Sequence, residues 1–252
     1  MRLLLILSVL ITTPFLAISQ YCPPLSGKAD GGRQFHITVG YGITRLYGDV
    51  NENNALGSAG TIKFDYSFIK GLYFGLESQF GSLKTDAINS AVPRQSDNDY
   101  IAGGVVATIH PFEFFSPKKY GRPTFGDLFA ESLFIGVGAL YVINNYDYIY
   151  RDVNNTSTYG VIEEVNEYGY PTFKERTRSL VLPSLNFGTA FPLNYQHNNY
   201  RGNVLSAVLK AQINFSGNDA LDGYTPYNAD GTLINSANDV YNFYSLGLRY
   251  SF

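Results

Sequence analysis

The sequence predicts an all-β protein: an antiparallel up-and-down transmembrane β-barrel of about eight strands with long extracellular loops. Three observations predict this fold: little charge beside many aromatic residues and glycines, apolar residues at alternate positions of about eight segments, and long connections that alternate with short ones. Charged residues are only 15% of the 252 residues, against about 25% in an average soluble domain. Aromatic residues are another 15%, as 21 Tyr and 18 Phe without Trp, and 25 residues are Gly.

Net charge and cysteine content exclude several kinds of protein. The formal net charge of −3 lacks the positive excess that a nucleic-acid-binding protein carries. The one cysteine, Cys22, excludes an internal disulfide framework and a zinc site built from cysteines. We therefore expect no nucleic acid among the partners, no metal site and no cofactor.

The first 19 residues have the features of a secretory signal peptide. The basic residue Arg2 precedes an apolar stretch over residues 3–16, and small residues occupy positions 17 and 19. The alternative, a membrane-spanning helix, needs about 20 apolar residues, and Thr12, Thr13 and Pro14 interrupt the run. We expect a signal peptide over 1–19, a periplasmic N-terminal segment over 20–34 and an outer-membrane β-barrel over 35–252.

The first predicted strand sets the pattern for the others. From Phe35 to Ile43 the apolar residues fall at every second position, and Thr, Gly and His lie between them, which is the period of a strand. Two further strands, over 61–68 and 72–81, are separated only by residues 69–71 and therefore form a tight hairpin. The remaining predicted strands cover residues 100–109, 133–143, 180–191, 204–215 and 240–252.

The connections between these strands alternate in length. The long ones cover 47–60, 82–98, 144–178 and 217–238, and the shorter ones cover 69–71, 110–131 and 192–202. In an up-and-down barrel this alternation places the long loops at one end, and the short turns with both termini at the other. The longest of the short-turn group, 110–131, includes a predicted helical turn at 124–129.

Alternation alone also fits a soluble barrel or a β-sandwich. The residue types on the two faces decide between them. The polar face consists mainly of Gly, Ser, Thr, Gln and Asn with few charges, which suits a narrow interior, while the other face is bulky and apolar. The apolar face turns aromatic at the strand ends, as interfacial girdles do: Phe35, Tyr66, Phe68, Phe80, Tyr141, Phe191, Phe215, Tyr244, Tyr250 and Phe252. A secreted soluble β protein is the alternative.

The last predicted strand carries the most specific motif. Its apolar residues are Tyr244, Leu246, Leu248, Tyr250 and Phe252, and Phe252 ends the chain. This motif resembles the C-terminal signature that the barrel assembly machinery of Gram-negative bacteria recognises. With the strand count and the loop pattern, it makes the chain similar to the small eight-stranded outer-membrane barrels of the OmpX and OmpA transmembrane-domain type.

The resemblance implies a location and partners. It implies that the protein is exported to the cell outer membrane, where outer-membrane lipid and the barrel assembly machinery are its partners. A fainter resemblance, through residues 46–50 and 219–224, is to the PorG-like barrels that accompany type IX secretion. It implies another envelope protein or a secretion-system component as a further partner.

The interior of an eight-stranded barrel is just wide enough for side chains to fill it. The predicted inward set includes Lys63, Asp65, Glu77, Lys210, Gln212 and Arg249, which together carry three positive and two negative charges. Unpaired charges in a closed lumen are costly, so opposite signs should pair across it and hold the barrel together. The alternative is that they line a gated ion path, as in a narrow porin-like channel.

Histidine content argues against an enzyme. Outer-membrane barrel enzymes use a His near the lipid-facing rim or the external loops, whereas His36, His110 and His197 fall at the short-turn side of the predicted barrel. Asp219, Asp222 and Asp230 lack the spacing of a calcium loop. We therefore predict no catalytic residues and keep a lipid-modifying enzyme as an alternative.

The connection 144–178 is the best candidate for activity. Tyr146, Tyr148 and Tyr150 alternate with other residues, so the preceding strand should continue above the membrane. Residues 159–165 and 170–176 around the turn 166–169 predict a further hairpin, either outside the membrane or as two more barrel strands. Exposed Tyr is typical of recognition surfaces. We therefore predict a structural, adhesive or accessory protein that binds its partners through this loop.

Overall fold

The computed structural model describes residues 34–47, 55–86, 95–115, 124–155, 162–173, 179–194, 203–217, 221–223 and 238–252. Residues 32–252 belong to one compact unit. The predicted signal peptide, Cys22 and the predicted periplasmic segment up to residue 33 lie outside the described residues.

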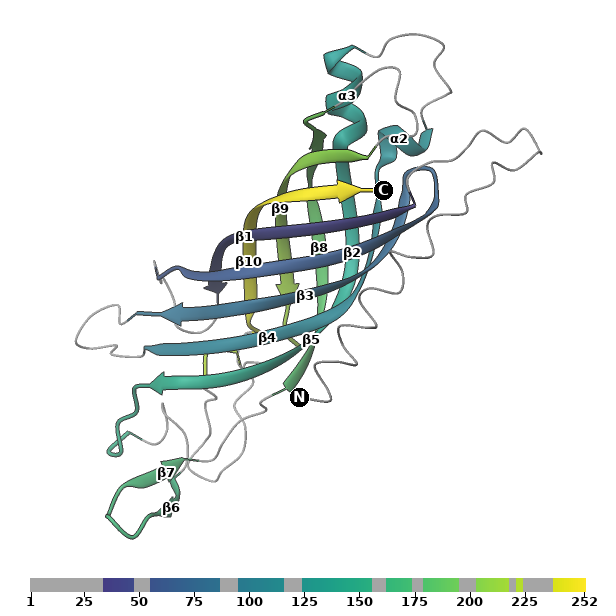
Figure 1. Cartoon of the computed structure of the whole chain (residues 1–252). Helices are drawn as coiled ribbons and strands as arrows, with labels where there is room; N and C mark the ends of the chain where they lie inside the picture. The colour runs from purple at the N-terminus through teal and green to yellow at the C-terminus, as the bar shows by residue number, and fades with distance from the viewer. Residues whose placement is uncertain are drawn as a thin grey trace, which may run out of the picture. The chain divides into compact units, whose positions relative to one another are not determined.

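Eight antiparallel strands form one closed barrel, which confirms the predicted fold (Figure 1). Around the barrel the strands follow the order β1, β10, β9, β8, β5, β4, β3 and β2. Their bounds are β1 Phe35–Tyr47, β2 Gly57–Ile69, β3 Leu72–Thr85, β4 Ser96–Ile109, β5 Leu133–Ile149, β8 Ser179–Pro192, β9 Val204–Phe215 and β10 Val240–Ser251. The first and last strands close the barrel, with Phe35 and Phe252 exchanging both backbone hydrogen bonds.

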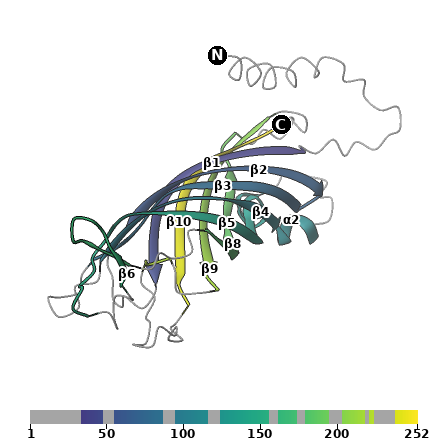
Figure 2. The ribbon, with the colours of Figure 1, turned by 90° about the horizontal axis from the view of Figure 1, so that it is seen from below.

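Every connection between neighbouring barrel strands joins adjacent members of the sheet, so the topology is up-and-down. The short β2–β3 turn contains Gly71, whose φ of +76° favours glycine. We call the end with this turn and the chain terminus the inner end, and the end with the four long connections the outer end. The view from below shows neighbouring barrel strands side by side (Figure 2).

Several strands extend further toward the outer end than the alternation predicts. β4 begins at Ser96 rather than at residue 100, and β5 continues to Ile149 rather than ending at 143. The continuation of β5 is the one predicted from its tyrosines. Because the ladder between β4 and β5 runs on to the pair Ser96 and Ile149, backbone pairing continues past the apolar stretch on which the strand prediction depends.

The long connection after β5 contains a separate two-stranded sheet. β6 Ile162–Val165 pairs with β7 Pro171–Phe173, and neither strand joins the barrel. Of the two predicted alternatives, the structure therefore has the extra hairpin and an unchanged eight-stranded barrel.

Two helices lie in the β4–β5 connection at the inner end. α2 covers Pro111–Phe115 and is not predicted by the sequence pattern, and α3 covers Phe125–Ser132, where a helical turn is predicted. Thr124 caps α3: its hydroxyl accepts from the Asp127 amide at 3.2 Å, and the Asp127 carboxylate accepts from the Thr124 amide at 3.0 Å.

The outward face of the barrel is apolar. Tyr41, Ile101 and Leu246 are 65%, 67% and 63% exposed, and most of the large outward side chains along the strands are Val, Ile, Leu, Phe or Tyr. A soluble monomer rarely exposes apolar patches of more than a few hundred Å², and this face surrounds the barrel. The surface is therefore suited to hydrocarbon, and the barrel crosses a membrane.

The inward face differs from the prediction in its outer half. Toward the inner end it is mainly polar and charged, as expected, with a small apolar cluster of Phe134, Ala190 and Val208. Toward the outer end buried apolar side chains gather in the lumen beside polar ones: Leu46, Leu83, Tyr100, Leu140, Val142, Leu182, Leu221, Tyr241 and Phe243. The outer half of the interior is therefore more apolar than the polar face of the predicted strands indicates. In the part of the chain that the structure describes, no helix is long and apolar enough to cross a membrane.

Candidate functional site

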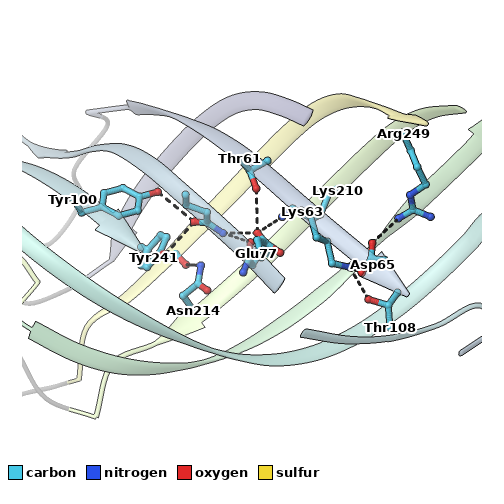
Figure 3. Close-up of polar contacts among 12 residues, drawn as sticks. Thr61, Lys63, Asp65, Glu77, Tyr100, Thr108, Lys210, Asn214, Tyr241 and Arg249 are labelled. Atoms are coloured by element: carbon cyan, nitrogen blue, oxygen red, sulfur yellow. Dashed lines mark hydrogen bonds and ion pairs between the residues drawn. The ribbon is translucent and has the colours of Figure 1, made fainter. Parts of the chain in front are cut away.

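The predicted interior charges meet inside the lumen. The Lys63 ammonium lies 2.9 Å from the Asp65 carboxylate, and the Lys210 ammonium lies 2.5 Å from that of Glu77. The Arg249 guanidinium lies 3.9 Å from Asp65. These side chains come from β2, β3, β9 and β10, so the ion pairs connect strands that are far apart in the sequence (Figure 3).

Glu77 is the centre of the network. Its Oε1 accepts hydrogen bonds from Thr61 Oγ1 at 3.3 Å and from Gln79 Nε2 at 2.7 Å, besides the ion pair with Lys210. Gln79 Nε2 also donates to Gln212 Oε1 at 2.7 Å, which carries the network across the barrel to β9. Glu77 is almost completely buried, so these donors to Oε1 replace part of the water that its carboxylate loses.

The other two cations are also held by neutral groups. Lys63 Nζ donates to Thr108 Oγ1 at 2.9 Å, and Arg249 Nε donates to Thr38 Oγ1 at 3.2 Å. The Arg249 guanidinium also lies 5.8 Å from the centre of the Phe134 ring, within cation–π range. The structure thus places all five predicted charged residues in the lumen, in one group around Asp65 and one around Glu77, which together carry three positive and two negative charges.

A small cavity lies between these side chains. It has a volume of about 20 Å³, measured as the space open to the centre of a water molecule, and is lined by residues that include Lys63, Asn186, Lys210 and Arg249. Such a volume admits about one water molecule. This cavity is therefore too small for a column of water.

The outer half is closed by a piece of the β9–β10 connection. Residues 221–223 lie in the mouth of the barrel, where Leu221 is completely buried in the apolar cluster. The Asp239 carboxylate accepts from the Leu221 amide at 2.6 Å and from the Asp222 amide at 3.3 Å. The Leu221 and Asp222 carbonyls accept from Asn98 at 3.1 Å and from Ser96 at 2.6 Å. We call residues 221–223 the mouth plug.

Two tyrosines join the apolar and charged halves. The rings of Tyr100 and Tyr241 lie 5.6 Å apart, and both hydroxyls donate to Gln79 Oε1, at 3.4 and 3.3 Å. The Lys210 ammonium lies 5.3 Å from the centre of the Phe243 ring. Neither the tyrosines nor the plug was among the predicted site residues. Tyr241 and Phe243 share the inward parity of Arg249, so the alternation of β10 could have predicted that both side chains point into the lumen.

The two described histidines, His36 and His110, are at the inner end, where His36 Nδ1 lies 2.7 Å from Ser251 Oγ. The Tyr73 ring lies between His36 and His110, 5.1 and 4.9 Å from them, and its hydroxyl donates to the Glu113 carboxylate at 2.9 Å. Burial and the nearby Arg249 charge lower the pKa of His110 to about 3, whereas burial raises the pKa of Glu113. His197, Asp219 and Asp230 lie outside the described residues.

Among the residues that the structure describes, no group of three or more His, Cys, Asp or Glu side chains is placed to hold a metal ion.

Two of the three candidate tyrosines at the outer end of β5 are less exposed than their pattern indicates. Tyr146 and Tyr150 are half-buried, and the Tyr150 amide donates to the Gln95 carbonyl at 3.0 Å; the Tyr148 side chain lies outside the described part. The exposed tyrosines of this connection lie further along the chain, on the β6–β7 hairpin, where Tyr168 and Tyr170 are 84% and 70% exposed.

The apolar residues of the terminal motif all point outward. Tyr244, Leu246, Leu248, Tyr250 and Phe252 are exposed on β10 and the residue after it. The Phe252 ring packs 5.9 Å from Tyr250 and 6.0 Å from Phe35, so the motif belongs to the membrane-facing surface at the closing seam. Recognition of this motif by the assembly machinery stays a prediction.

Comparison with known proteins gives structural likeness only. No family model matches the chain, and neither does any curated protein. Similar solved structures include Neisserial surface protein A, at 12% identity over 86% of this chain and 97% of that chain, with a TM-score of 0.44. Ail from Yersinia pestis, in complex with the heparin analogue sucrose octasulfate, has 13% identity over 88% and 99%, with a TM-score of 0.39.

A third similar structure is OprG from Pseudomonas aeruginosa, at 8% identity over 88% of this chain and 98% of that chain, with a TM-score of 0.41. The resemblance to barrels that accompany type IX secretion gains no support from these three structures. The architecture itself follows from the strand pairing and the apolar surface described above. Because an even-numbered, closed antiparallel barrel with a hydrocarbon-facing exterior is the construction of bacterial outer-membrane proteins, the chain is a small eight-stranded outer-membrane β-barrel, built like the OmpX-type barrels that its last strand resembles.

Proposed function

We propose that the protein is a non-enzymatic outer-membrane barrel that binds a partner protein at the cell surface through its β6–β7 hairpin. The single observation that carries this proposal is the exposure of Tyr168 and Tyr170, two positions apart in the sequence, at the tip of that hairpin. Tyrosine combines a large apolar ring with a polar hydroxyl, and it is enriched where proteins bind one another.

The hairpin tip is ordered by its own turn. Asn166 Oδ1 accepts from the amides of Tyr168 and Tyr170 at 3.1 and 2.9 Å. Gly169 takes a φ of +80°, and its amide donates to the Asn166 carbonyl at 2.9 Å. Because the turn is already formed, a partner that binds the two rings does not have to order this backbone, which favours affinity.

The chemistry around the rings indicates the kind of partner. Val165 is exposed beside them, and Glu164 and Glu167 add negative charge to the same hairpin. The complementary surface is an apolar patch flanked by Lys or Arg, since opposite charges at the rim steer association. The hairpin therefore suits a protein with a basic rim.

The lumen and the histidines favour this proposal over the alternatives. A channel needs a continuous path, whereas the charged network and the mouth plug fill both halves of the lumen. A lipid-modifying enzyme needs a reactive group near the rim or the external loops, and the described histidines, His36 and His110, are both buried at the inner end. The filled barrel instead serves as a rigid base for the loops.

The test compares a double variant with a matched control on the same connection. Tyr168→Ala/Tyr170→Ala removes both rings, and Val153→Ala removes apolar surface from another exposed residue outside the hairpin. Each tagged variant is purified from native cells in mild detergent, and the proteins that accompany it are quantified by mass spectrometry. We expect a tenfold or greater loss of the specific partner for the double variant only, since clustered aromatic anchors carry about 2 kcal/mol or more each.

Heat-modifiable migration on gels is the control that checks whether both variants keep the barrel. The proposal is wrong if the double variant retains the same partners in the same amounts as the unaltered protein.

A further inference from the structure

The inner end of the barrel carries an unusual number of exposed aromatic side chains. Five phenylalanines on α2 and α3 are exposed, and we call them the inner-rim phenylalanines: Phe112, Phe114, Phe115, Phe125 and Phe129. Phe115 and Phe125 are 76% and 73% exposed. Exposed aromatic rings at this density are unfavourable in water, because each ring presents about 150–250 Å² when uncovered.

The helices that carry these rings are fixed to the barrel. The His110 amide donates to the Gly71 carbonyl at 2.7 Å, and the Phe114 amide donates to the His110 carbonyl at 2.8 Å, which places α2 against the β2–β3 turn. The approach is so close that a Cβ on Gly71 would lie 2.7 Å from the Phe114 nitrogen. α2 therefore has a defined position on the inner rim.

The second helix is anchored to β8 and to the residue before α2. The Ser132 and Thr189 hydroxyls lie 2.6 Å apart, and His110 Nδ1 lies 3.2 Å from the Glu131 carbonyl oxygen. Ser132 is the buried residue of α3, so the rest of the helix does not contribute to the barrel interior. The exposed rings of α3 are thus held at the rim and not directed into the lumen.

The exposed rings are continuous with the membrane-facing surface. The Phe125 ring lies 5.5 Å from that of Phe191, which has the same strand parity as the outward residues Leu185 and Phe187 of β8. This ring contact connects the apolar surface of β8 to α3. A partner that covered Phe125 would have to replace lipid at Phe191 as well.

We propose that α2 and α3 lie in the inner leaflet of the outer membrane, with the inner-rim phenylalanines among phospholipid chains close to the headgroups. Interfacial helices combine such rings with basic residues, and the sequence between the two helices contains Lys118, Lys119 and Arg122. These positions lie outside the described residues, so only the positive charge that they give to the segment supports the proposal. The inner rim of the barrel is thus a phospholipid-binding surface.

The chain offers a direct test because it contains no Trp. Phe125→Trp and Phe115→Trp each place one fluorophore at an exposed ring position. Leu76→Trp provides a reference within the membrane-facing wall, and Tyr168→Trp provides one on the outer hairpin. The four proteins are reconstituted in phosphatidylcholine vesicles whose chains carry bromine either close to the headgroup or close to the methyl end, and heat-modifiable migration confirms folding.

We expect bromine close to the headgroup to reduce the emission of Phe125→Trp and Phe115→Trp by about half or more, as for side chains at the headgroup–acyl boundary. Leu76→Trp should respond more to the deeper bromine. Tyr168→Trp should respond to aqueous iodide and to neither lipid. The proposal is overturned if the two inner-rim tryptophans respond to iodide and not to brominated lipid, since the face would then be open for a periplasmic protein or a second copy of the chain.

Discussion

At the scale of single residues, a substitution of Glu77 in the lumen should be costly. It is buried and accepts from Lys210, Gln79 and Thr61. Glu77→Gln removes the charge that compensates Lys210, and breaking a buried pair by changing one partner costs about 3–5 kcal/mol. We expect a loss of about 3 kcal/mol in the free energy of unfolding, measured by urea titration in detergent micelles.

The double variant Glu77→Gln/Lys210→Met removes both charges. Its loss in the free energy of unfolding should be about 2 kcal/mol smaller than the sum of the losses of the two single variants, as for residues in direct contact. The exposed pair Lys84 and Asp97, at 2.6 Å, is the control, and Asp97→Asn should leave the unfolding midpoint unchanged because solvent screens it. Additive effects of Glu77→Gln and Lys210→Met would show that the pair contributes nothing as a pair.

His110 gives the inner end a defined response to pH. Its pKa in the folded protein is about 3, because of burial and the positive charge of Arg249, whereas an unfolded His titrates near 6.5. Between these values the unfolded chain binds a proton that the folded chain does not. The contribution of His110 to stability is therefore complete above about pH 6.5 and declines as the pH falls toward 3.

The measurement compares unfolding free energies of the unaltered protein and His110→Gln from pH 8 to pH 4. Glu113 acts in the opposite direction, since burial raises its pKa, but it is present in both proteins and drops out of the difference. We expect the unfolding free energy of the unaltered protein minus that of His110→Gln to be constant above about pH 7 and to decrease progressively below it. A difference that stays constant down to pH 4 contradicts the assigned protonation state.

At the scale of elements, the strands were predictable to the extent that their apolar residues alternate. For β9 the predicted and observed bounds coincide at Val204 and Phe215. β4 and β5 exceed their predicted lengths because their outer ends carry polar residues such as Asn98 and Asn144, which backbone pairing keeps in the sheet. α2 was missed because five residues cannot display a helical period.

The mouth plug is an element without any periodic signal, and its stability depends on Asp239. The carboxylate accepts two backbone amides of the plug, and bonds to a charged acceptor contribute about 1.5–3 kcal/mol each. Asp239→Asn should therefore raise amide hydrogen exchange at Leu221 and Asp222 about tenfold or more, with no change at paired amides of β9. Asp97→Asn is the control and should leave amide exchange in the plug unchanged. If Asp239→Asn and the unaltered protein exchange these amides equally fast, other contacts hold the plug.

At the scale of the whole molecule, barrel closure and the inside-out surface were predictable, but the filling of the lumen was predictable only in part. Inward parity placed Lys63, Glu77 and Arg249 correctly inside, because parity is a property of each strand. Which side chains meet across the lumen depends on the order and register of all eight strands. Leu221 reaches the lumen from a loop, so no strand pattern could have identified it.

A filled lumen predicts that the barrel does not conduct ions. The network around Glu77, the Tyr100 and Tyr241 pair and the mouth plug lie one after another along the axis, so opening one of them leaves the others closed. In planar bilayers we expect no single-channel steps from the unaltered protein or from Lys63→Ala. Lys63→Ala should still lower the thermal unfolding midpoint, because it leaves Asp65 with only the more distant Arg249. Discrete conductance steps that are present in the unaltered protein and altered by Lys63→Ala would instead show that these charges line a path for ions.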